Sequence, residues 1–351
     1  MNSKGLKYLA KDSAKWLAIS AGLEFANMLR MLPYGQKSRH RGVIFTLHHV
    51  REGRVCGFSP NAHLSVTPDF LDTAIKTVLD EGYEIIPLHA IKARLQEPDG
   101  KSFAVFTLDD GYRNNASDAL PVFTRYQAPF TVFAARGLTR RTNTIWWETV
   151  AALLNTQDAF EYDFGSGPET LHCRSLSEKT AVSERLARHI IGRHENSAIA
   201  ALNIAAEKCG IDPLGIVDTL VMDEAELSDF ARQPLVSIGA HTCSHRALAF
   251  LDDTTAATEM RESADYVEAV TGIRPCTLAY PYGFRTAVSG RDERLAGECG
   301  FKLAVTTQPG TLGTNALSRP YALPRISLNG LYQKARYVRA LAGGLPFGMT
   351  G

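Results

Sequence analysis

Short runs of apolar, β-branched and aromatic residues recur along most of the chain after residue 40. Seven of these runs, nearly free of charge, have the length and composition of parallel strands buried on both faces. They are residues 43–48, 83–88, 103–108, 130–135, 235–240, 276–281 and 302–307. Helical patterns separate them; residues 67–82 and 252–272, for example, begin near a capping residue and end at a glycine. This alternation predicts an α/β fold, arranged as a sheet or a barrel.

One segment interrupts the alternation. Residues 148–232 show mostly helical periodicity and no convincing strand, so we predict a helical insertion between two strands of the core. The core domain is then expected to span residues 41–330. Residues 331–351 are expected to form a C-terminal helix and tail.

The first 40 residues have a pattern of their own. Four lysines precede residues 16–32, an apolar stretch that superficially resembles a signal peptide. Glu24, Asn27 and Arg30 interrupt this stretch, and no clear cleavage site follows it. The spacing of the leucines favours an amphipathic helix packed on the domain. Because the stretch is not a convincing signal peptide, we predict a cytoplasmic protein, with secretion as the alternative. Contact of residues 4–32 with a membrane surface is a less favoured interpretation, and no stretch is long enough to span a bilayer.

The composition narrows the functional classes. Among 351 residues, 45% are hydrophobic and 21% are charged, which is typical of a soluble globular protein. The 38 basic residues balance 37 acidic ones, so the charge gives no support for a nucleic-acid partner. Six cysteines are scattered without close spacing, which favours reduced thiols over a disulfide framework.

Polar clusters stand where the predicted strands end. Each of them alone would be interpreted as a turn or a helix cap. In α/β folds, however, functional sites gather at the carboxyl ends of the strands, and here several clusters share that location. The clusters are His48-His49, Asp109-Asp110-Gly111, His241 with His245, and Pro281-Tyr282-Gly283.

His241 and His245 suggest a metal site. Two imidazoles and one carboxylate, with a fourth position left open, are the ligands of a hydrolytic zinc centre. Such a metal polarises a carbonyl oxygen and lowers the pKa of a bound water. Asp109 and Asp110 together offer a ligand and a neighbouring base for the water's proton. Cys243 is a less favoured ligand because it lies between the histidines in a short loop.

Three stretches resemble the motifs of a known family. "TLDDG" at 107–111, "HTCSH" at 241–245 and "AYPYG" at 279–283 resemble the first three motifs of the NodB-homology polysaccharide deacetylases, carbohydrate esterase family four. The resemblance covers roughly residues 41–328. It implies a distorted (β/α) barrel and a reaction that removes N-acetyl, sometimes O-acetyl, groups from amino-sugar units of an oligo- or polysaccharide.

The same resemblance implies roles for individual residues. Asp110, His241 and His245 would hold a divalent metal, most simply zinc, and Asp109 would be the general base. The backbone N–H of Tyr282 would face the developing oxyanion.

The sequence also departs from the family pattern. Ala279 stands where the third motif usually has an arginine that orients the base, and the D-x-x-D-W motif is absent. Arg285 or Arg325 could replace that arginine, and we favour Arg325 because it follows a strand-like stretch. The late histidine that acts as general acid is also missing, since "LPRISLNG" stands in its place and no histidine follows His245.

His49 is the predicted replacement for the missing acid. A branch of the superfamily has a Tyr-His pair at the end of its first strand, and on that alignment His48 matches the tyrosine and His49 the histidine. The alternative is a histidine pair that only caps the strand. Trp146 and Trp147 are expected either to form a wall against which a sugar stacks or to pack the insertion.

Two other functions remain open from the sequence. The same fold and metal could act on another non-peptide amide, such as a cyclic ureide or imide. A non-catalytic carbohydrate-binding relative would have lost the base or a ligand, and all four of these positions are intact. The signature motifs of zincin proteases, α/β-hydrolases and P-loop proteins are absent.

Overall fold

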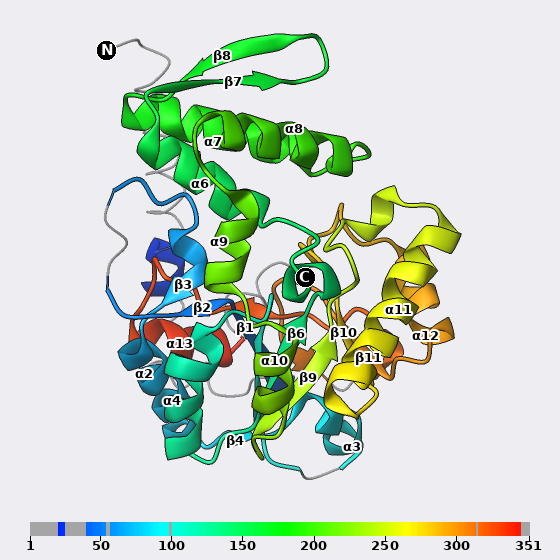
Figure 1. Cartoon of the computed structure of the whole chain (residues 1–351). Helices are drawn as coiled ribbons and strands as arrows, with labels where there is room; N and C mark the ends of the chain where they lie inside the picture. The colour runs from blue at the N-terminus through cyan, green and yellow to red at the C-terminus, as the bar shows by residue number, and fades with distance from the viewer. Residues whose placement is uncertain (1–19, 25–39, 54–56, 98–99, 314, 345–351) are drawn as a thin grey trace.

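The computed structural model describes residues 20–24, 40–53, 57–97, 100–313 and 315–344. Its central element is a curled sheet with the strand order β11-β10-β9-β6-β5-β1-β12, in which β4 pairs with β5 and β13 pairs with β1 (Figure 1). The strands are β1 (His40–Leu47), β4 (Glu84–Ile85), β5 (Phe103–Leu108), β6 (Phe130–Ala134), β9 (Val236–Ala240), β10 (Thr277–Ala279), β11 (Leu303–Val305), β12 (Leu312–Gly313) and β13 (Ile326–Ser327).

All seven predicted strands are present in this sheet and run parallel to their neighbours. β5 is buried at every position, which explains its unbroken apolar pattern. Only β12 runs antiparallel, beside β1. Because β11 and β12 end the order without pairing with each other, the sheet forms a curled half-barrel. The predicted fold class, a distorted (β/α) barrel, is confirmed.

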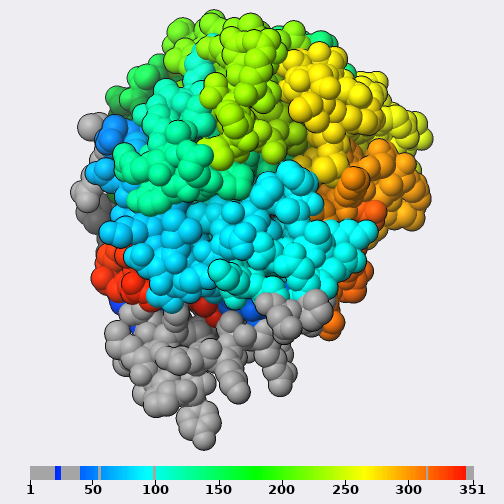
Figure 2. All heavy atoms as spheres, turned by 90° about the horizontal axis from the view of Figure 1, so that it is seen from below, coloured from blue at the N-terminus to red at the C-terminus, as the bar shows by residue number. Residues whose placement is uncertain are grey.

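Helices cover the outer face of the sheet. The helices are α2 (Pro68–Asp80), α3 (Ile91–Gln96), α4 (Leu120–Arg125), α5 (Arg136–Thr139), α11 (Asp253–Thr271), α12 (Gly290–Glu298) and α13 (Ala335–Ala342). The ends of the predicted helices follow their caps: the Thr67 hydroxyl accepts a hydrogen bond from Phe70 N at the start of α2, and α11 ends at Gly272, whose φ is 76°. Figure 2 shows the molecule from below, where cyan segments meet the yellow and orange of α11 and α12.

The insertion between β6 and β9 projects from the sheet (Figure 1). It holds α6 (Trp146–Thr156), α7 (Leu176–Ile190), α8 (Glu195–Lys208), α9 (Pro213–Leu220) and α10 (Glu224–Ala231). Its first helices form a hydrophobic cluster of their own, which includes Leu153, Leu186 and Leu202. Because this segment packs around a small core of its own, it does not follow the alternation of strands and helices in the barrel.

The insertion also contains a hairpin that the sequence interpretation missed. β7 (Ala159–Asp163) and β8 (Pro168–His172) pair antiparallel, although no strand was predicted between residues 148 and 232. The hairpin buries Phe160, Tyr162 and Leu171, which alternate with exposed residues. Two glycines with positive φ make its turn, so a period of two and a Gly-x-Gly turn were the available signals.

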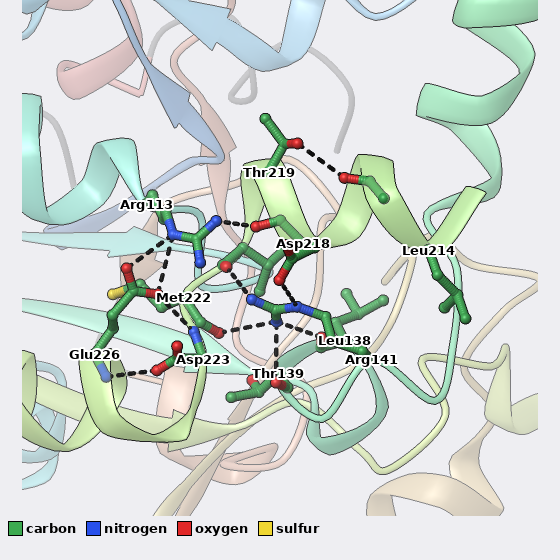
Figure 3. Close-up of polar contacts among 12 residues, drawn as sticks. Arg113, Leu138, Thr139, Arg141, Leu214, Asp218, Thr219, Met222, Asp223 and Glu226 are labelled. Atoms are coloured by element: carbon green, nitrogen blue, oxygen red, sulfur yellow. Dashed lines mark hydrogen bonds and ion pairs between the residues drawn. The ribbon is translucent and has the colours of Figure 1, made fainter. Parts of the chain in front are cut away.

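The end of the insertion returns to the motif after β5. The Met222 N–H donates to the Gly111 carbonyl at 3.0 Å, and the Arg113 N–H donates to the Leu220 carbonyl at 2.8 Å. Figure 3 shows the side chains around this contact. Arg141 donates to the backbone carbonyls of residues 138, 139, 221 and 222, and Arg113 pairs with Glu226. The insertion is therefore anchored at both ends of its path.

The two ends of the described chain meet at α13. Residues 20–24 are helical, Leu23 is buried, and Glu24 accepts hydrogen bonds from Arg336 and Tyr337. The rest of the predicted N-terminal helix, and most of the stretch considered for membrane contact, lies outside the described residues. Within the described ranges, no helix is both long and apolar enough to cross a membrane.

Candidate active site

Asp110, His241 and His245 come together at the carboxyl ends of β5 and β9. Their ligand atoms lie within 4.8 Å of one another, and the side chains are at most 10% exposed. The Nε2 atoms of His241 and His245 are 3.5 and 3.3 Å from Asp110 Oδ1. Burial alone would raise the pKa of Asp110, but the two imidazoles outweigh it and hold the pKa well below its ordinary value.

This trio fits a divalent metal. Asp110 Oδ1 is buried and makes no hydrogen bond to a described residue, so the carboxylate has an uncompensated oxygen that faces two imidazole nitrogens. The His241 Nδ1–H donates to the Ala279 carbonyl at 2.7 Å, which leaves the Nε2 lone pair free for a metal. Ala279, which replaces the family's arginine, therefore contributes its backbone to the site.

Asp109 is clamped by Arg325. The two guanidinium nitrogens of Arg325 each lie 2.7 Å from an Asp109 oxygen, and the Arg325 side chain is fully buried. Burial raises the pKa of Asp109, but the charge and the hydrogen bonds of Arg325 outweigh burial and lower it. Asp109 is therefore a carboxylate at neutral pH. Arg285, the other candidate, is exposed.

The structure corrects the placement of the histidine pair. His48, not His49, lines the cavity, and its Nε2 is 4.0 Å from Asp109 Oδ2. His49 is fully buried on the other side, against the Tyr112 ring at 3.6 Å, and its Nδ1 is 2.9 Å from the Asn114 amide. Burial lowers the pKa of His49 to about 3 and also lowers the pKa of His48, so the position of His49 behind the cavity, and not its pKa, excludes it from the site.

The reason for this reversal is local. β1 ends at Leu47, and His49 begins β2 (His49–Val50), which pairs with β3 (Ser65–Val66). The chain bends at His48 and enters the separate β2–β3 sheet at His49, so that His48 faces the site and His49 packs behind it.

Tyr282 has a strained backbone beside the metal ligands. Its φ is 60°, in the left-handed region that non-glycine residues rarely adopt. The Thr307 hydroxyl donates to the Tyr282 carbonyl at 2.6 Å, and the Tyr282 ring lies 5.2 Å from the His245 ring. Burial and the carboxylate of Glu195 raise the pKa of Tyr282 well above its ordinary value, so the hydroxyl keeps its proton.

One cavity of about 410 Å³ lies between the barrel and the insertion, and its lining includes His48, Asp109, Asp110, His241, His245 and Tyr282. Trp146, Trp147 and Val150 of α6 form part of its wall, together with Leu64 and Phe284. The two indoles meet edge to face, with their ring centroids 5.7 Å apart. The predicted tryptophan wall thus faces the cavity and also packs the insertion. Sequence reasoning missed Glu195, which reaches Tyr282 from the insertion.

Comparison with known proteins agrees with this site. Residues 183–303, which include the second and third motifs, match the model of the polysaccharide deacetylase family. The chain carries a polysaccharide deacetylase domain. It is accordingly a hydrolase of carbon–nitrogen bonds other than peptide bonds, as its motifs predict. The first motif, residues 107–111, lies outside the matched residues.

Solved structures of this family share the fold. A polysaccharide deacetylase from Bacillus cereus is 13% identical, with a TM-score of 0.53 over 86% of this chain and 68% of that one. A de-N-acetylase from Aggregatibacter actinomycetemcomitans is 11% identical, with a TM-score of 0.53 over 85% and 99%. No curated protein gives a significant match.

Proposed function

We propose that the protein is a metal-dependent N-deacetylase of amino-sugar units in an oligo- or polysaccharide. The observation that carries the proposal is the single cavity in which the Asp110, His241 and His245 trio lies beside Asp109, a carboxylate held by a buried arginine. Two imidazole nitrogens and one carboxylate suit zinc. The match to the polysaccharide deacetylase family and the polysaccharide deacetylase structure of the same fold support a carbohydrate substrate.

Each residue of the site has its own role in the proposed reaction. Zinc, when bound, supplies a polarised acyl carbonyl and a water of lowered pKa. Asp109, kept ionised by Arg325, accepts the proton of the attacking water. The Tyr282 N–H, which donates to no described residue, stabilises the negative charge that develops on the carbonyl oxygen. We assign the protonation of the leaving amine to His48, the imidazole outside the ligand set that lies 4.0 Å from Asp109.

The test is acetate release by the zinc-loaded protein from a panel of N-acetylated oligosaccharides. A cyclic ureide and an imide are assayed beside this panel, because they are the alternative substrates considered for an enzyme with this fold and metal site. Zinc-dependent acetate release from the sugars supports the proposal. Turnover of the ureide or imide alone would overturn the substrate class while leaving the metal chemistry intact.

The role of His48 predicts a selective defect. His48→Ala is expected to bind zinc normally and to hydrolyse amides about 100-fold more slowly, since general-acid catalysis is typically worth 10²- to 10⁴-fold. An activated ester, whose leaving group needs little protonation, should be affected much less. The measurement is kcat/KM for both substrates.

His49→Ala is the matched control for that experiment. It removes the neighbouring imidazole, which lies behind the cavity. We expect it to lower the melting temperature and to leave kcat/KM for the amide nearly unchanged. Equal slowing of both substrates in His48→Ala, or a selective amide defect in His49→Ala, contradicts the assignment.

A further inference from the structure

Glu195 is a buried carboxylate that the proposed reaction does not use. It is the first residue of α8 in the insertion, and only 1% of it is exposed. Its Oε1 accepts a hydrogen bond from the Tyr282 hydroxyl at 2.6 Å, and its Oε2 accepts one from the Ala247 N–H at 3.1 Å. One carboxylate of the insertion thus holds both motif loops of the barrel, one after His245 and one at Tyr282.

Tyr282 is fixed at three points. Its hydroxyl donates to Glu195 and accepts from Trp146 Nε1 at 2.8 Å. Its carbonyl accepts from the Thr307 hydroxyl. A non-glycine residue in the left-handed region is strained and persists only where its surroundings hold it. The backbone N–H of Tyr282, which makes no hydrogen bond to a described residue, is oriented by these three anchors.

We infer that Glu195 is a positioning residue, which fixes the Tyr282 backbone so that its N–H points to the carbonyl oxygen of the substrate. The inference rests on the proposed function, because it concerns the oxyanion of the same reaction. It also gives the insertion a role in catalysis besides forming a wall. Glu195 does not line the cavity, so it acts through the two groups that it holds, the Tyr282 hydroxyl and the Ala247 N–H in the loop after His245.

The expected signature is a loss of kcat with little change in KM. A donor aimed at charge that exists only in the transition state contributes to kcat and not to substrate binding. Removing such a donor typically costs 10²- to 10³-fold, and misplacing it costs less. We therefore expect a fall of about 10- to 100-fold in kcat.

Two substitutions and their combination test the inference. Glu195→Gln keeps the shape of the side chain, but Tyr282 and Ala247 donate to different oxygens of Glu195, and the amide NH₂ that replaces one of these oxygens cannot accept a hydrogen bond. Tyr282→Phe keeps the ring and the backbone and removes the hydroxyl. Each variant should lose kcat, and the double variant should lose no more than the worse single one, because the two groups act as a unit.

Two controls separate positioning from folding. Leu202→Ala loosens the hydrophobic cluster of the insertion, against which Tyr282 packs, but removes none of the hydrogen-bond partners of Tyr282, and Glu207→Gln removes an exposed carboxylate from the same helix. Leu202→Ala should lower the melting temperature and leave kcat per folded molecule unchanged. Unchanged kcat in both test variants, or losses that multiply in the double variant, would overturn the inference.

A crystal structure of Glu195→Ala gives a test that needs no turnover. Tyr282 is expected to leave the left-handed region or to swing its hydroxyl away from Trp146. An unchanged Tyr282 overturns the inference even if the protein deacetylates sugars. A displaced Tyr282 in a protein that releases no acetate would instead count against the proposed function alone.

Discussion

Asp109→Asn is expected to fold and to bind zinc as the wild type does, but to lose about 10²- to 10⁴-fold in kcat. Asparagine matches aspartate in shape and cannot accept the proton of the water. The substitution also leaves the buried Arg325 without its partner charge, so a lower melting temperature should accompany the loss of activity. The measurements are kcat, zinc content by elemental analysis, and thermal unfolding.

Arg325→Lys is the matched variant for this prediction. Lysine keeps the positive charge but cannot form the bidentate contact, so it should hold Asp109 less well and lose less activity than Asp109→Asn. Loss of zinc from Asp109→Asn would make Asp109 a ligand. Near-normal turnover would remove it from the mechanism.

His241→Ala and His245→Ala are each expected to abolish stoichiometric zinc binding and, with it, turnover. Either change leaves Asp110 with one imidazole partner, and two protein ligands do not make a stable zinc site. Elemental analysis of the purified variants measures the effect directly. Cys243→Ser serves as the control, because Cys243 lies in the same loop and its backbone N–H donates to Glu259. Zinc loss in Cys243→Ser, or full zinc in both histidine variants, contradicts the ligand set.

The barrel could be predicted from the sequence because its strands are buried on both faces and therefore appear as uninterrupted apolar runs. β5 has six buried positions in a row, a pattern that no amphipathic helix produces. The β7–β8 hairpin was not recognised, because its short alternating strands lie within a long helical context and pack only on the insertion. Local periodicity is weak evidence for strands of five residues.

The residues of the site that belong to sequence motifs could be predicted from the sequence. Asp110, His241 and His245 lie at the strand ends where their motifs placed them, and Arg325 is the arginine that contacts Asp109. Which of His48 and His49 faces the cavity depended on β2, whose pairing with β3 is a tertiary contact. The Glu195 contact joins residues 87 positions apart, and no local pattern signals it.

The return of the insertion to the first motif has a consequence for the order of folding. Gly111 and Met222 enclose a loop of more than one hundred residues, and closing it carries an entropic cost before the contact forms. The backbone after Asp110 therefore acquires its final support late, once α9 and Arg141 are in place. Zinc should then bind competently only to chains whose insertion has folded. In refolding experiments, zinc uptake is expected to lag behind the formation of the central strands.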